Sequence, residues 1–143
     1  MFRLTTLALT ILCLLTTLSC QSYSSGLEKT VAVADETAVT GTLHTIALAQ
    51  QSYATANSGA YGTFAELAAG GFLDSRFSAE KPRIKDYAFT MEVGKDAGGP
   101  SYKCSADPSD SAVRPGRHFQ IDSTSDKVHV NPTQPASASD PAL

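Results

Sequence analysis

Three patterns of apolar positions follow one another along this chain. Residues 4–18 form a short apolar run rich in Leu and Thr. From about residue 27 to 57, apolar side chains recur with the 3.6-residue period of a helix. Between residues 87 and 130 they alternate with polar side chains, which is the period of a half-buried strand. The chain therefore predicts an apolar leading segment, then a long helix, then a sheet.

The long helix is predicted from one apolar stripe and from signals at its two ends. Ser25 and Glu28 have the spacing of a capping box. Asn57-Ser58-Gly59 is typical of a helix end, because Gly and Asn adopt the left-handed conformation found there. We expect the stripe to face the core, and its members are Val39, Leu43, Ile46 and Tyr53.

A second capping box, Thr63 with Glu66, predicts a short helix that ends at Gly70-Gly71. Four alternating segments follow, near residues 87–93, 102–106, 118–122 and 128–130. The fold class predicted is α+β, with the long N-terminal helix packed on a four-stranded antiparallel sheet. The remaining predicted core residues are Phe64, Leu67, Phe72, Phe89, Tyr102, Cys104, Phe119 and Ile121.

Two segments show neither period. Residues 74–86 are polar and contain Pro82, so we expect them to be irregular. Residues 132–143 hold three prolines among small and polar residues, which is typical of a disordered tail. The expected organisation is a leading segment at 1–19, a short tether at 20–26, one domain at 27–131 and the tail at 132–143.

The leading segment has the features of a secretory signal peptide. Arg3 is the only charged residue before Glu28, an apolar run follows it, and the small residue Ser19 precedes Cys20. A cysteine at this place resembles the lipobox of bacterial lipoproteins. The resemblance implies cleavage before Cys20 and acylation of its thiol by fatty acids such as palmitate. Two alternatives are a soluble secreted protein and a retained anchor, for which residues 4–18 fall short of the roughly 20 needed to span a bilayer.

Lipidation would place the protein in the cell envelope, with membrane lipid as a partner through Cys20. The domain would face the periplasm or the exterior. Gln21 stands where some lipoproteins carry an Asp that alters export, so the resemblance favours the outer membrane. Two or three acyl chains suffice for stable anchoring, at about 0.8 kcal/mol per buried methylene.

Composition narrows the functional classes further. The net charge is −3, from 11 basic and 14 acidic residues, and loss of Arg3 with the signal would make it −4. No basic face for nucleic acid is expected. Of the three cysteines, Cys13 would leave with the signal and Cys20 would be acylated, so Cys104 has no disulfide partner. We expect Cys104 to be a buried, unreactive thiol.

No enzyme motif is present, and we expect a non-enzymatic protein without a cofactor. The chain contains no Gly-x-Ser-x-Gly, Ser-x-x-Lys or His-Glu-x-x-His sequence. Weak metal candidates are His118 and His129, with Gln120 opposite His129 on the polar face of the last hairpin. Asp122 and Asp126 would offer oxygens to calcium, although no Asp-x-Asp-x-Asp-Gly pattern accompanies them.

The globular part resembles the head of a type IV pilin or a type II secretion pseudopilin. The resemblance lies in residues 49–57, the Gly-x-Tyr-containing segment 59–73, the strand pair 87–90 and 102–108, and residues 115–131. A pilin, however, keeps its apolar helix after a Gly cleavage site, and here no Gly precedes residues 4–18.

The two resemblances together imply a lipid-anchored envelope protein with a pilin-like domain. Its role would be interaction or assembly with envelope proteins, linked to type IV pilus or type II secretion machinery. One alternative is a periplasmic lipoprotein that binds a small ligand or a metal. Another is a genuine filament subunit with a degenerate leader.

Overall fold

The computed structural model describes residues 19–109 and 116–143, with side chains from residue 31 onward. The predicted signal peptide therefore lies outside the described residues, apart from Ser19. Residues Asp35–Leu143 form one compact unit. Before Asp35, residues 19–34 are helical, and side chains are described only for residues 31–34 of them.

The long helix, α2, spans Ser19–Ala56 and begins earlier than expected. Residues 20–26 are helical rather than a tether, and Ser25 lies inside the helix rather than at its cap. The reason is that each residue added to an existing helix gains one hydrogen bond, which offsets modest penalties such as that of Gly26. The predicted end is confirmed, because Ser58 and Gly59 have positive φ and Gly59 N donates to Ala54 O at 2.8 Å.

The short helix α3, Phe64–Ala69, has the predicted capping box. Thr63 Oγ1 accepts from Glu66 N at 3.3 Å, and Thr63 N donates to the Glu66 carboxylate at 2.7 Å. The hydrogen bonds that the Glu66 carboxylate accepts from Thr63 N and from the Thr63 hydroxyl lower the pKa of Glu66. A 3-10 turn, η1 at Ser75–Phe77, follows within the segment expected to be irregular, and it buries Phe77.

The sheet has five antiparallel strands in sequential order, so the prediction of four strands is wrong. The strands are β1 Arg83–Ile84, β2 Tyr87–Asp96, β3 Gly99–Pro108, β4 His118–Asp122 and β5 Ser125–Asn131. The four predicted strands correspond to β2–β5, and β1 is the additional one.

Strand β1 pairs with the start of β2 through a tight turn in which Lys85 has a φ of 55°. Phe89 N also donates to Pro82 O at 2.9 Å. A strand of two residues is too short to show an alternating pattern, so its pairing depends on the turn and on β2. This is why the sequence pattern did not indicate it.

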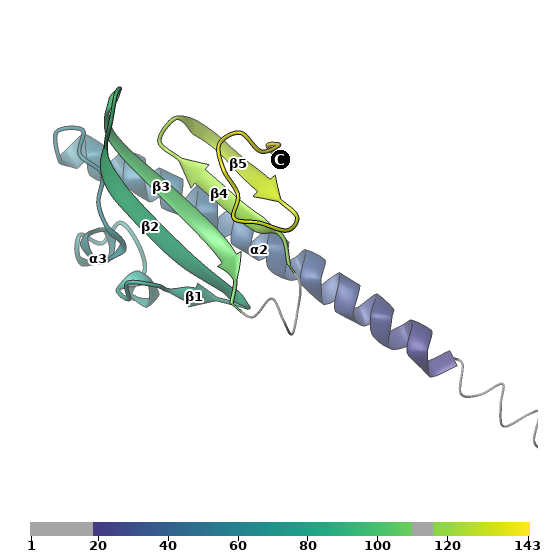
Figure 1. The fold of residues 1–143 in the computed structure, drawn as a ribbon. Coiled ribbons are helices and arrows are strands. Elements are labelled where there is room, and N and C mark those ends of the chain that lie inside the picture. The colour runs from purple at the N-terminus through teal and green to yellow at the C-terminus, as the bar shows by residue number, and fades with distance from the viewer. Residues whose placement is uncertain (1–18, 110–115) are drawn as a thin grey trace, which may run out of the picture. The chain divides into compact units, whose positions relative to one another are not determined.

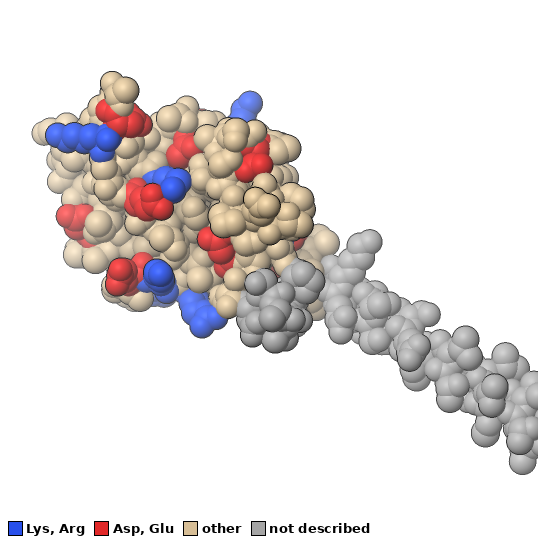
Figure 2. Space-filling view, viewed as in Figure 1, with Lys and Arg blue, Asp and Glu red and all other residues tan. Residues whose placement is uncertain are grey.

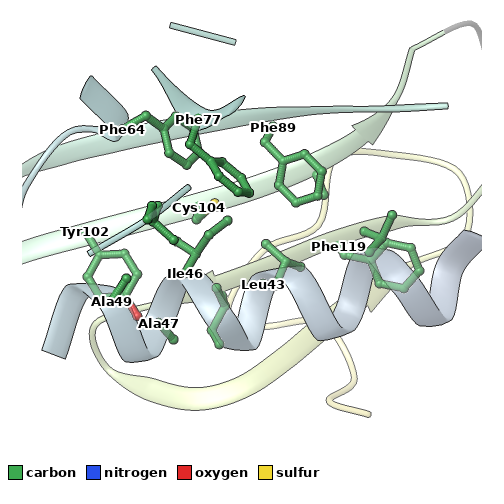
Figure 3. Packing of buried hydrophobic residues seen from close by; sticks show 14 of the residues in the cluster. Leu43, Ile46, Ala47, Ala49, Phe64, Phe77, Phe89, Tyr102, Cys104 and Phe119 are labelled. Carbon is green, nitrogen blue, oxygen red and sulfur yellow. The ribbon is translucent and has the colours of Figure 1, made fainter. Parts of the chain in front are cut away.

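Within the compact unit, α2 lies against one face of the sheet (Figure 1). Alternation along the strands directs Phe89, Cys104 and Phe119 toward Leu43 and Ile46 of the helix, and all five side chains are fully buried (Figure 3). The structure buries ten of the twelve predicted core residues. The other two, Tyr53 and Phe72, are partly buried and pack edge to face with ring centroids 5.5 Å apart.

Residues 132–143 were expected to be disordered, whereas the structure places residues 141–143 along the outer edge of β5. Val130 N donates to Pro141 O and Leu143 N donates to Val128 O, both at 2.9 Å. Local hydrogen bonds hold this segment, and little of its apolar surface is buried. A composition argument about core burial does not detect such contacts.

Gln50 is a fully buried polar side chain in the helix–sheet interface. Its Oε1 accepts from Gly62 N at 2.9 Å and its Nε2 donates to Gly62 O at 2.6 Å. A side chain at position 62 would lie 3.1 Å from the Tyr53 ring, so glycine fits there. The amide of Gln50 thereby fixes the α2–α3 loop on the helix.

We predict that Leu43→Ala lowers the free energy of unfolding by about 2–5 kcal/mol, because it leaves a cavity under the sheet. Leu48, on the same helix but 63% exposed, provides the matched control. Leu48→Ala should change stability by less than about 0.5 kcal/mol. Chemical denaturation of both variants measures the difference, and equal losses would contradict the assigned helix face.

We predict that Gln50→Ala lowers the free energy of unfolding by roughly 2–4 kcal/mol, because two buried backbone groups of Gly62 lose their partners. The neighbouring Gln51 is exposed, so Gln51→Ala should be nearly neutral. Thermal and urea unfolding of the pair test this. A stable Gln50→Ala protein would show that water replaces the amide.

Candidate functional site

The face of the sheet opposite α2 carries a row of charged side chains. Glu92, Lys103 and Asp122 stand at paired positions on β2, β3 and β4. Lys103 Nζ lies 2.9 Å from Glu92 Oε2, and both side chains are largely exposed. Such a pair contributes at most about 1 kcal/mol to stability. Acidic and basic side chains are interspersed over this face (Figure 2).

Asp122 is nearly buried, and both of its carboxylate oxygens are engaged. Its Oδ1 accepts from Thr124 N at 2.9 Å and from the Thr124 hydroxyl at 2.5 Å. Its Oδ2 accepts from Gln120 Nε2 at 3.2 Å. These bonds close the tight turn between β4 and β5, where Asp122 pairs with Ser125. Asp122, predicted as a weak metal candidate, therefore has a structural role.

A groove of about 520 Å³, lined mostly by residues with polar side chains, lies on this face between the far end of the β2–β3 hairpin and residues 137–138. We call it the outer groove. The side chains lining it include carboxylates, ammonium groups, an amide and hydroxyls, but no His or Cys. They are suited to hydrogen bonding with a polar ligand. Its lining residues are Glu92–Asp96, Ser101–Lys103, Gln120, Asp122–Thr124, Ser137 and Ala138.

The two predicted histidines lie on the outward face but do not converge. His118 Nδ1 donates to Asp107 Oδ1 at 2.6 Å, and His129 Nδ1 donates to Asp140 O at 2.7 Å. The predicted pairing of Gln120 with His129 is confirmed. Asp126 is exposed in β5. Within residues 31–109 and 116–143, no three His, Cys, Asp or Glu side chains gather as a metal would require.

Of the two cysteines predicted to remain in the mature chain, Cys104 and Cys20, the structure describes the side chain of Cys104. Cys104 is fully buried on β3, and burial raises the pKa of its thiol well above the usual range. A thiol in this state is not a nucleophile. Cys20, predicted to be lipidated, lies in the first turn of α2, and its side chain is outside the described residues.

Two ion pairs that the sequence did not indicate join α2 to the sheet. The Glu36 carboxylate accepts from Arg117 Nη2 at 2.7 Å and Nε at 3.0 Å, which raises the pKa of Arg117. The guanidinium also lies over the Phe119 ring at 5.5 Å. Lys85 lies 3.7 Å from Asp35. Arg117 is 81 positions from Glu36, so no local pattern signals this contact.

Tyr87 carries a buried hydroxyl for which the described residues offer no hydrogen-bond partner. Burial is the main cause that raises the pKa of Tyr87 to about 12. A side chain at Gly116 would come within 2.6 Å of this hydroxyl, so glycine is needed there. Tyr87 also packs against Phe119, with ring centroids 5.9 Å apart. Its place in the core gives it a packing role.

Residues 137–140 bind back onto β5 through the side chain of Asp140. Asp140 Oδ2 accepts from Ser137 N at 2.7 Å and from the Ser137 hydroxyl at 2.8 Å. Asp140 Oδ1 accepts from Asn131 Nδ2 at 2.9 Å. We call this arrangement the Asp140 clip. Its hydrogen bonds, led by that of the Ser137 hydroxyl, lower the pKa of Asp140.

Comparisons with known proteins give no relative for this chain. No protein-family model, curated protein or solved structure matches it. In the part of the chain that the structure describes, no helix has both the length and the apolar character to cross a membrane.

We predict that acid releases residues 137–143 from β5. Because the folded-state pKa of Asp140 is depressed, its hydrogen bonds stabilise docking above the ordinary carboxyl value of 3.8 and are lost as the pH falls through the folded pKa. NMR resonances of the Ser137 and Leu143 amides, followed from pH 5 to 2, measure this. In Asp140→Asn the transition should vanish, and an unchanged transition would assign it to another group.

Proposed function

We propose that this chain is a lipid-anchored protein of the bacterial cell envelope whose pilin-like head makes protein contacts. The observation that carries the proposal is the cysteine directly after an apolar, signal-like run, at the point where a long helix begins. Ser19 and Cys20 open α2, and the same helix supplies the core residues Val39, Leu43 and Ile46.

The order of elements supports the comparison with pilin heads. A long helix, a short capped helix and an antiparallel meander follow one another, and the long helix covers one face of the sheet within residues 35–143. The additional strand, β1, extends the meander at the edge formed by β2. Because a fold hosts many functions, this likeness supports the class of protein rather than a partner.

A non-enzymatic role fits the chemistry of the described side chains. Cys104 is buried, and each predicted histidine already has a partner. In the lining of the outer groove the Thr124 hydroxyl donates to the Asp122 carboxylate, but Asp122 is nearly buried and its carboxylate holds the β4–β5 turn. We therefore propose an interaction or assembly role, linked to type IV pilus or type II secretion machinery.

The outer groove supports a second candidate, a periplasmic lipoprotein that binds a small polar ligand. Its volume of about 520 Å³ lies within the common range for ligand pockets. Most ligand pockets have mainly apolar linings, whereas the residues that line this groove are mostly charged or polar and lie on the sheet face. We therefore rank this candidate second.

The intact mass of the mature protein from its native membrane fraction tests the proposed anchor. We expect a chain that starts at Cys20 and carries added acyl mass. Cys20→Ala should abolish both the acyl mass and membrane retention. Cys13→Ala, in the apolar run, is the matched control and should be processed normally.

Two other outcomes would contradict the lipid anchor. A mature chain that retains residues 4–19 without acyl mass would instead favour a filament subunit with a degenerate leader. A chain cleaved near residue 19, but without acyl mass, would favour a soluble secreted protein.

A further inference from the structure

Strand β5 has one edge paired with β4 and a second edge covered by residues 141–143. Val130 N donates to Pro141 O, and Leu143 N donates to Val128 O, both at 2.9 Å. His129 stands opposite Ala142 in an antiparallel bridge. A single short stretch of main chain therefore satisfies the outer edge of the last strand of the sheet.

Hydrogen bonds, rather than apolar burial, hold this segment. Ala136 is its one buried hydrophobic residue, whereas Leu143 is 63% exposed. The Asp140 clip supplies one side-chain bond to β5, from Asn131, and two bonds from Ser137 within the segment itself. His129 Nδ1 also donates to Asp140 O at 2.7 Å. Because these bonds are near the surface, water competes for them, and the segment has little to keep it permanently in place.

We propose that the outer edge of β5 is a strand-acceptor site, which residues 140–143 occupy within one chain and the same residues of a second copy occupy between chains. The structure shows how such a segment pairs with β5: after Asp140, Ala142 forms an antiparallel bridge with His129. Addition of a strand to an exposed edge uses main-chain hydrogen bonds for affinity, and side chains give the selectivity. Here the selective group on β5 is Asn131, which donates to the Asp140 side chain, while His129 adds a hydrogen bond to the Asp140 main-chain oxygen.

The β5 edge would make the same contacts with residues 140–143 of its own chain and of a second copy. The two arrangements therefore differ only in the effective concentration of the segment that binds. A segment tethered by a short linker competes at an effective concentration on the order of millimolar. Residues 132–139 form that linker. A second copy would therefore bind measurably only when the intramolecular contact is weakened or when copies are crowded together.

A peptide of residues 132–143, titrated into the ¹⁵N-labelled full chain, tests the proposal. We expect the NMR resonances of the Val128 and Val130 amides to shift when the peptide binds. The labelled Asp140→Ala chain should bind the peptide roughly tenfold more tightly than the wild-type chain, because the variant has lost its own clip. Glu80→Ala, which removes one exposed negative charge elsewhere, is the matched control and should behave as wild type. The peptide with Asp140→Ala should bind at least roughly tenfold more weakly.

Several results would overturn the proposal. One is equal peptide affinity for the wild-type and Asp140→Ala chains. Another is the absence of shifts at Val128 and Val130 at millimolar peptide. A third is equal binding of a scrambled peptide. If Asp140→Ala does not fold, Ser137→Ala weakens the same clip from its donor side and replaces it in the test.

Discussion

The packing of the α2 stripe against the apolar face of the sheet is the interaction on which the rest of this structure depends. Cys104 is the only cysteine among residues 35–143, so no disulfide within this unit assists the core. Leu43 and Phe119 are fully buried on opposite sides of the interface, which takes apolar surface from both layers out of water. The buried amide of Gln50 then fixes the loop to α3 at the end of the same helix.

The periodicity of apolar residues predicted the side chains that this packing buries, but not the polar contacts around it. The 3.6-residue stripe on the helix and the alternation in β2–β5 gave the core side chains, because burial selects residue type at each position. Strand β1 was missed, since two residues carry no period. The Glu36–Arg117 ion pair was missed because it joins residues 81 positions apart, and the Asp140 clip was missed because single polar residues carry no period that signals their partners. The predicted metal ligands His118 and Asp122 instead have protein partners.

The two faces of the sheet have different physical roles. One face is committed to α2, and its side chains cannot change size without a loss of stability. The opposite face carries the Glu92–Lys103 pair and the outer groove, and residues 132–143 run along its last strand. The Glu92–Lys103 pair there is exposed, so it can be exchanged for contacts with another molecule at small cost to the core. An anchored interaction domain would need such a face.

Native-state hydrogen exchange most directly tests whether the helix and sheet form one cooperative unit. The amides of Leu43 and Ile46 in α2, and of Cys104 and Phe119 in the sheet, should exchange only through global unfolding. All four should then report the same free energy, equal to that from denaturant unfolding. If the α2 amides exchanged at a clearly lower free energy than those of the sheet, the sheet would be stable without the helix. That result would contradict the central role of this packing.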